Sequence, residues 1–149
     1  MKNKGLWLFG ISGSGKSFIS KFIKRKLKNS ILLDGDSIRK YISFDLTYSK
    51  KDRIIQTKRV LGLAEICIRN KLFPIISTVY LSKKIYLKAK KKGILVVKIE
   101  RKKSKTNLKL KNMKNVVGVD IPLPNFKCLI VQNTNKKSIN NFLNYVKKK

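Results

Sequence analysis

Eight residues near the amino terminus constrain the fold of this chain more than any other feature. Residues 10–17 read Gly-Ile-Ser-Gly-Ser-Gly-Lys-Ser, which matches the phosphate-loop pattern in full. An apolar run at residues 6–9 precedes the loop, and apolar residues recur at helical spacing over residues 17–28. A loop of this kind between a strand and a helix predicts an α/β fold that binds phosphate groups.

Each residue type in the loop has a chemical reason. Glycine lets the backbone curl so that successive N–H groups face phosphate oxygens, and the helix amino terminus adds a partial positive charge. We expect Lys16 to contact the β- and γ-phosphates of a nucleotide and the Ser17 hydroxyl to join the shell of a Mg²⁺ ion. The predicted nucleotide-binding residues are therefore Gly10, Ser12, Gly13, Ser14, Gly15, Lys16 and Ser17.

Strand-like and helix-like segments alternate along the rest of the chain. Apolar runs predict further strands at residues 31–33, 73–77, 94–99 and 128–131. Helical spacing of apolar residues predicts helices over residues 49–70, 82–92 and 139–146. This alternation predicts a three-layer α/β sandwich, with a mostly parallel five-stranded sheet and helices on both faces. Because no linker or repeat interrupts it, we expect one domain over residues 1–149.

Two residue types exclude several kinds of chemistry. The chain has no histidine, so it cannot use a Ser-His or Cys-His pair, a histidine base or a histidine metal ligand. Its two cysteines cannot form a cysteine-rich zinc site, and their apolar neighbours favour reduced thiols packed in the core of a cytosolic protein. Acid–base chemistry must therefore come from carboxylates, Lys, Tyr or Cys.

The chain is strongly basic, with 37 Lys and Arg against 7 Asp and Glu and a formal net charge of +30. Such a charge favours anionic partners, of which a small anionic nucleotide fits the phosphate loop. The basic residues are spread along the whole chain without a recognition motif, so no specific nucleic-acid partner is expected. No apolar run approaches the roughly 20 residues of a membrane span, and we expect a soluble, cytoplasmic protein without a membrane partner.

The positions of the carboxylates distinguish between classes of nucleotide-binding proteins. A GTPase needs Asn-Lys-x-Asp, but residues 135–138 read Asn-Lys-Lys-Ser, and the strand at residues 73–77 lacks the terminal Asp of motor ATPases. Asp34 and Asp36 instead follow the second predicted strand, at the end where open α/β sheets bind ligands. A carboxylate there can orient an acceptor hydroxyl and take its proton, which is typical of small-molecule kinases.

Several motifs, taken in order along the chain, resemble those of the adenylylsulfate kinase family of phosphate-loop kinases. After the loop come Asp-Gly-Asp at residues 34–36, Asp-Arg at residues 52–53 and Val-Gly-Val-Asp-Ile-Pro at residues 117–122. This family transfers the γ-phosphate of MgATP to the 3′-hydroxyl of adenylylsulfate, and the product serves sulfate assimilation or sulfation. The resemblance implies the same reaction here, with ATP and Mg²⁺ as cofactors.

The resemblance also implies roles for individual residues. Lys16, Asp34 and Asp36 would be catalytic, with Asp36 as the proton acceptor, and Ser17 and Asp34 would hold the metal. Two arginines would bind sulfate or phosphate and one tyrosine would stack on the adenine of the acceptor, in an implied substrate-binding set of Arg39, Tyr48, Arg53, Gln56, Val119 and Asp120. The basic segment over about residues 101–117 falls where the family has its lid.

The chain departs from the family where the acceptor would bind. Gln56 stands in place of an Asn, Val-Tyr-Leu-Ser at residues 79–82 replaces Phe-Ile-Ser-Pro, and the lid is shortened. These differences leave two alternatives beside adenylylsulfate kinase. One is a kinase of another nucleotide-linked acceptor, such as cytidine diphosphoramidate in capsule synthesis, and the other is a nucleotide-binding protein with degenerate activity. The sequence leaves the choice between a monomer and a homodimer open.

Overall fold

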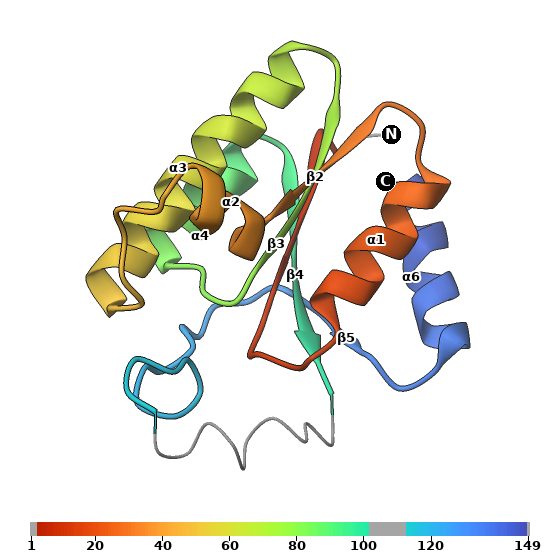
Figure 1. The fold of residues 1–149 in the computed structure, drawn as a ribbon. Helices are drawn as coiled ribbons and strands as arrows, with labels where there is room; N and C mark the ends of the chain where they lie inside the picture. The colour runs from red at the N-terminus through yellow and green to blue at the C-terminus, as the bar shows by residue number, and fades with distance from the viewer. Residues whose placement is uncertain (1–2, 102–112, 149) are drawn as a thin grey trace.

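A five-stranded parallel sheet forms the centre of the protein (Figure 1). The structure is a computed structural model that describes residues 3–101 and 113–148. All four pairs of neighbouring strands are parallel. In sheet order the strands are β2 (Ser30–Asp34), β3 (Phe73–Thr78), β1 (Gly5–Phe9), β4 (Ile94–Glu100) and β5 (Leu129–Gln132). The predicted α/β fold is confirmed.

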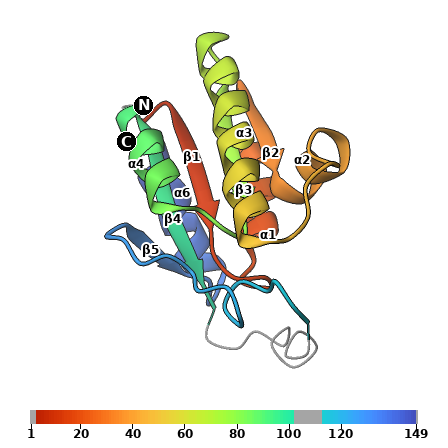
Figure 2. The same ribbon diagram turned by 90° about the vertical axis from the view of Figure 1, so that its left-hand side faces the viewer.

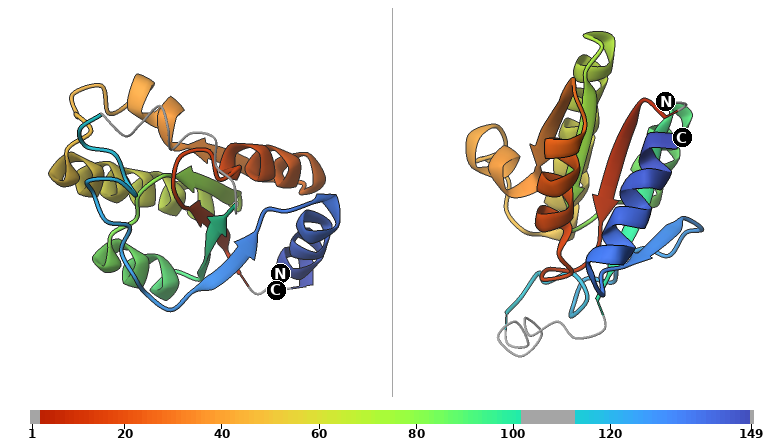
Figure 3. Two further views of the ribbon diagram at one scale, coloured as in Figure 1. Left: turned by 90° about the horizontal axis from the view of Figure 1, so that it is seen from below. Right: turned by 90° about the vertical axis from the view of Figure 1, so that its right-hand side faces the viewer.

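Helices cover both faces of the sheet, which explains why the central strands are continuous apolar runs rather than alternating ones. Helices α3 (Lys50–Arg69) and α4 (Lys83–Lys91) lie on one face, as Figure 2 shows. Helices α1 (Lys16–Lys26) and α6 (Lys136–Lys148) lie on the other, facing the viewer in the right-hand view of Figure 3. Strands β1 and β3 are buried along their whole length between these layers.

Each face of the sheet has its own hydrophobic core. One core joins α1 and α6 to the sheet through residues such as Ile19, Phe142 and Leu8. The other joins α3 and α4 to the opposite face through residues such as Trp7 and Val60, both fully buried. Trp7 and Leu8, two successive residues of β1, thus enter opposite cores, because successive side chains of a strand point to opposite faces.

The helices agree with the sequence pattern, with one exception. The long helix α3 is capped by Ser49, whose Oγ accepts a hydrogen bond of 3.1 Å from the backbone N–H of Asp52. The short helix α2 (Gly35–Tyr41) was not predicted. Its only buried residue is Ile38, so it has no apolar stripe, and the side chain of Asp34 caps its amino terminus. The side chains that follow β2 therefore lie on a helical turn rather than on a loop.

The structure tests the predicted lid and the predicted burial of the cysteines only in part. Most of the predicted lid, residues 102–112, lies outside the described residues, and residues 113–121 form a loop at the carboxyl edge of the sheet (Figure 1).

Both cysteines are free, and Cys67 is buried as expected while Cys128 is partly exposed. Within the described part of the chain, no helix combines the length and apolar character that crossing a membrane requires.

Candidate functional site

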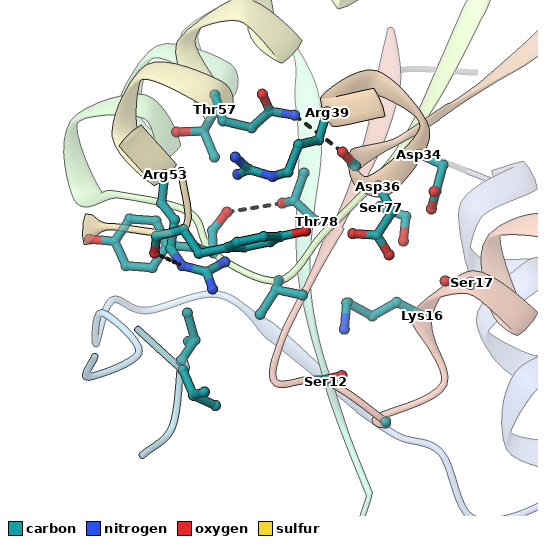
Figure 4. A pocket seen from close by; sticks show the side chains of 18 of the residues that line it. Ser12, Lys16, Ser17, Asp34, Asp36, Arg39, Arg53, Thr57, Ser77 and Thr78 are labelled. Carbon is teal, nitrogen blue, oxygen red and sulfur yellow. Dashed lines mark hydrogen bonds between the residues drawn. The ribbon is translucent and has the colours of Figure 1, made fainter. Parts of the chain in front are cut away.

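A cavity of about 520 Å³ lies at the carboxyl ends of β1, β2 and β3 (Figure 4). The phosphate loop lines one side of it. Side chains from the turn after β2, from α3 and from the end of β3 line the other side, together with the loop at residues 113–117. This is the edge at which open parallel sheets bind ligands, because all strands end there and all following loops meet.

The phosphate loop has the backbone that its glycines predict. Gly15 has a φ of 94° and Gly10 a φ of 147°, a region that side-chain-bearing residues rarely adopt. A Cβ atom at Gly10 would lie 2.4 Å from the carbonyl oxygen of Ile99, so β4 leaves no room for one. Gly10 and the fully buried Ser14 do not line the cavity, although both were predicted to bind the nucleotide. Gly10 contributes to the site through the backbone conformation of the loop and its close approach to β4.

Lys16 begins α1 and turns back into the loop. Its Nζ donates a hydrogen bond of 2.8 Å to the carbonyl oxygen of Ile11 and one of 3.4 Å to Ser14 Oγ. Burial lowers the pKa of Lys16 to about 8, although the negative charges of Asp36 and Asp34 act in the opposite direction. The ammonium group is thus desolvated but still mostly protonated at pH 7, and a bound anion would stabilise its charged form.

The two carboxylates after β2 face the same space as Lys16 (Figure 4). Asp34 Oδ2 accepts hydrogen bonds from the backbone N–H and the hydroxyl of Ser37, at 3.3 and 3.4 Å. Asp36 lies in the first turn of α2 and is exposed. The structure therefore brings together the lysine and both aspartates that the sequence singled out, although 18 residues separate Lys16 from Asp34.

The oxygen donors in this cavity suit a magnesium ion bound together with a nucleotide. Ser17 and Asp34 both line the cavity, and both hydrogen bonds that Asp34 accepts from Ser37 use the same carboxylate oxygen, Oδ2. Among the described residues, no cluster of three or more His, Cys, Asp or Glu side chains could enclose a metal by itself. Mg²⁺ commonly takes one or two protein oxygens and completes its shell with phosphate oxygens and water, so the residues present fit this ion.

An aromatic ring and two arginines form the opposite wall. The guanidinium carbons of Arg39 and Arg53 lie 4.6 and 5.4 Å from the centre of the Tyr48 ring. Arg39 donates hydrogen bonds to the carbonyl oxygens of Leu46 and Thr47, at 3.2 and 2.7 Å. In the described structure neither guanidinium forms an ion pair with a carboxylate. Both charges therefore remain available to an anionic ligand.

Arg53 connects this wall to the loop at residues 113–117. It donates hydrogen bonds of 3.0 Å to the Tyr48 carbonyl oxygen and 2.8 Å to the Asn115 carbonyl oxygen. Burial, and then the nearby charge of Arg39, lowers the pKa of Arg53. Two like charges held this close, in partly buried positions, are what a multiply charged anion would neutralise. Tyr48 thus also positions these arginines, besides its predicted stacking role.

Gln56 lies deeper in the cavity, where only 4% of the residue is exposed. Its Nε2 donates a hydrogen bond of 3.2 Å to the carbonyl oxygen of Gly35, the residue between the two aspartates. Its Oε1 is buried without a hydrogen-bond partner among the described residues. A buried acceptor of this kind is costly unless a ligand or water donates to it.

Val119 and Asp120, which were predicted to contact the substrate, are not among the described residues that line the cavity. Asp120 instead accepts hydrogen bonds from the backbone N–H groups of Asn115 and Val116, at 2.6 and 2.5 Å. These bonds lower the pKa of Asp120. Val119 is largely exposed. The Asp120 carboxylate therefore holds the loop against which Arg53 rests, and its influence on the cavity is indirect.

Several residues at the end of β3 line the cavity although they were not among the predicted site residues. Ser77 and Thr78 are buried and line the cavity, and Trp7 Nε1 donates a hydrogen bond of 2.8 Å to Thr78 Oγ1. Ser77 pairs in register with Asp34 on the neighbouring strand. The polar end of the strand at residues 73–77 was a signal for this placement, because parallel strands end at one edge of a sheet.

Comparison with known proteins adds an independent observation. The family model described as adenylylsulphate kinase matches residues 2–106. An adenylyl-sulfate kinase of Pseudomonas aeruginosa is 36% identical over 78 residues, which are 50% of this chain and 40% of that protein. One of Rippkaea orientalis is 33% identical over 85 residues, 53% of this chain and 47% of that protein. These alignments span less than half the length of either relative.

Solved structures match nearly the whole chain. The structure of a Mycobacterium tuberculosis APS kinase in complex with AMPPNP and APS has a TM-score of 0.83 at 21% identity, covering 99% of this chain and 96% of that one. A hexameric APS kinase from Thiobacillus denitrificans has a TM-score of 0.68 at 18% identity, covering 99% of this chain and 29% of that one. At these identities the likeness concerns the fold.

Proposed function

The chain belongs to the adenylylsulfate kinase family, and from this premise we propose that it is a kinase that transfers the γ-phosphate of MgATP to the 3′-hydroxyl of adenylylsulfate. One observation carries the proposal. Lys16 of the phosphate loop and the carboxylates of Asp34 and Asp36 face one cavity, and its opposite wall presents two arginines that form no ion pair with a carboxylate among the described residues (Figure 4). This arrangement supports a donor phosphate on one side of the cavity and a second anion on the other.

The donor side would hold the triphosphate of ATP. Backbone N–H groups of residues 10–17 and the amino terminus of α1 would bind the phosphates, and the Lys16 ammonium would leave its contact with the Ile11 carbonyl to reach them. Ser17 and Asp34 would hold Mg²⁺, which when bound neutralises charge on the phosphates. Lys16 is desolvated before the nucleotide arrives, so its interaction with phosphate would be stronger than that of a solvated lysine.

The acceptor side would orient the second nucleotide and its reacting hydroxyl. Arg39 and Arg53 would bind the anionic group of the acceptor, and Asp36 would accept the proton of the hydroxyl as its oxygen attacks the γ-phosphorus. The new bond joins that oxygen to phosphorus while the bond from phosphorus to the β,γ-bridging oxygen breaks, so ADP leaves. The unpaired Oε1 of Gln56, buried beside Gly35, would accept a hydrogen bond from the bound acceptor.

Gln56 also favours a second candidate function. The family has an Asn at this position, and the longer Gln lines the cavity with a side-chain carbonyl oxygen that has no hydrogen-bond partner among residues 3–101 and 113–148. A kinase of another nucleotide-linked acceptor, such as cytidine diphosphoramidate, would share the phosphate loop and both aspartates but differ at such a position. The reaction class would be unchanged, and only the acceptor would differ.

A screen of acceptors tests the proposal. The protein would be mixed with MgATP and either adenylylsulfate, a cytidine-linked acceptor or no acceptor, and ADP release would be measured. We expect turnover of about 1–100 s⁻¹ with adenylylsulfate, the usual range of kinases. Turnover with the cytidine-linked acceptor alone would support the second candidate. ADP release that does not depend on any acceptor, or none at all, would contradict both and indicate degenerate activity.

A further inference from the structure

We propose that Asn133 is a positioning residue for the phosphate loop. Its side-chain amide holds the peptide between Ser14 and Gly15 in the orientation that turns the Gly15 N–H toward a bound phosphate. The inference deepens the proposed function and rests on it in one respect, which is that a nucleotide binds with its phosphates in this loop. It does not depend on the identity of the acceptor.

The contact joins two parts of the chain that are far apart in sequence. Asn133 follows the edge strand β5, and its Nδ2 donates a hydrogen bond of 2.9 Å to the carbonyl oxygen of Ser14, 119 residues away. The backbone N–H of Asn133 donates a hydrogen bond of 2.7 Å to the carbonyl oxygen of Glu100, at the end of β4. The amide is therefore anchored to the sheet, and through it the loop is anchored too.

The Asn133 amide occupies the space in which a side chain at Gly15 would lie. A Cβ atom at Gly15 would lie 2.0 Å from Asn133 Nδ2, far inside any normal contact. The φ of 94° at Gly15 already disfavours other residues, so the position requires glycine for two reasons. One is the backbone conformation of the loop, and the other is the side chain that approaches it from β5.

Because the peptide between Ser14 and Gly15 is planar, the hydrogen bond to the Ser14 carbonyl oxygen also fixes the direction of the Gly15 N–H. The described residues contain no cis peptide bond, so the Ser14 carbonyl and the Gly15 N–H point in opposite directions. Holding the carbonyl toward Asn133 turns the N–H away from Asn133. Gly15 lines the cavity and Asn133 does not, which supports the inferred direction of the N–H, away from Asn133 and toward the cavity in which a phosphate would lie.

Without the amide, this peptide would be free to rotate. Glycine tolerates both signs of φ, so the Gly15 side of the peptide offers little resistance to a flip. A flipped peptide would present the Ser14 carbonyl oxygen to the phosphate and remove one N–H donor. The expected cost of losing Asn133 is therefore a loss of phosphate affinity, separate from any loss of fold stability.

The experiment measures binding of MgADP and of adenylylsulfate to the whole chain by calorimetry, together with the midpoint of thermal unfolding. We expect Asn133→Ala to weaken MgADP binding about three- to tenfold, the usual effect of one neutral hydrogen bond. Asn133→Asp should weaken it more, because an ionised carboxylate cannot donate to the Ser14 carbonyl. Adenylylsulfate affinity and the unfolding midpoint should stay close to those of the unchanged protein.

Gln132→Ala is the matched control. Gln132 is the neighbouring amide residue, and its Nε2 donates a hydrogen bond of 2.8 Å to Glu100 Oε2, at the edge of the sheet, rather than to the phosphate loop. An equal loss of MgADP affinity in Gln132→Ala would overturn the inference, as would an unchanged affinity in Asn133→Ala. A loss in Asn133→Ala that affects both ligands and the midpoint equally would show a merely structural role. If the unchanged protein binds no MgADP, the proposed donor site fails, and this inference fails with it.

Discussion

The two sides of the cavity are built in different ways. The phosphate-loop side is one continuous segment, residues 10–17, that offers backbone N–H groups and a single lysine. The opposite side collects side chains from α2, the α2–α3 connection, α3 and the loop at residues 113–117. The residues of one short segment share one backbone conformation, so a substitution in it affects the whole phosphate-binding side. On the opposite side, single side chains from separate elements can be substituted without altering the others. Gln56, Val79 and Tyr80, which the sequence comparison marked as departures from the family pattern, line that second side.

The two sides also carry different kinds of charge. Lys16 is desolvated and titrates at about pH 8, so its charge depends on conditions and on what binds to it. On the other side the cationic groups are planar guanidinium groups, and backbone carbonyl oxygens orient those of Arg39 and Arg53. We therefore expect changes on one side to alter donor binding and changes on the other to alter acceptor binding. Four measurements test this separation.

The largest effect is expected from Lys16→Ala. Removing the ammonium should lower ADP release in the presence of acceptor about a thousandfold, at the upper end of what one preorganised donor contributes. The midpoint of thermal unfolding at pH 7 should not fall, because the buried charge is unfavourable to the folded state below pH 8. Lys24→Ala, an exposed change on the same helix, is the control and should leave turnover unchanged. Turnover within tenfold of normal in Lys16→Ala would place the donor elsewhere.

Asp36→Asn should have the next largest effect. Loss of the proton acceptor should lower kcat by at least about a hundredfold, while MgADP affinity remains normal. Asp34→Asn provides the comparison. Because Asp34 is the expected magnesium ligand, this substitution should weaken MgADP binding in addition to lowering kcat. If Asp36→Asn weakens MgADP binding and Asp34→Asn does not, the two assignments are reversed.

Arg53→Gln should affect the acceptor alone. We expect its KM for the acceptor to rise about thirtyfold, the usual loss for hydrogen bonds to a charged group, with the KM for MgATP unchanged. Arg59→Gln is the matched control on the same helix, since Arg59 forms an ion pair with Asp45 and does not line the cavity. An equal rise in both KM values in Arg53→Gln would show that the two sides do not act separately.

The smallest effect is a pH dependence confined to the donor side. Above pH 8 the unliganded protein loses the Lys16 proton, and binding of the anionic phosphates must then be coupled to proton uptake. MgADP affinity should therefore fall about tenfold between pH 7 and pH 9, whereas acceptor affinity should change little because arginine keeps its proton. Lys16→Met should abolish the dependence. A steeper loss on the acceptor side would contradict the separation.

Some of this arrangement could be predicted and some could not. The strand, loop and helix around residues 10–17 were predicted because their pattern is local, and Asp34 and Asp36 followed from their place after a strand. Helix α2 was missed because it buries only Ile38 and depends on the Asp34 side chain for its start. A short motif does not tell which way its side chains face, so nothing in the sequence indicated that the Asp120 carboxylate accepts hydrogen bonds from the backbone of residues 115 and 116 and that neither Val119 nor Asp120 lines the cavity.

The order of apolar runs, helical periods and glycines along the chain was enough to determine the α/β architecture and the phosphate loop, because these depend on interactions between near neighbours. Tertiary structure alone decided which side chains complete the cavity. The contacts of Arg53 with Asn115, of Trp7 with Thr78 and of Asn133 with Ser14 join residues 62 to 119 positions apart. They exist because the sheet brings loops at the carboxyl ends of its parallel strands to one edge, and no local pattern encodes that proximity.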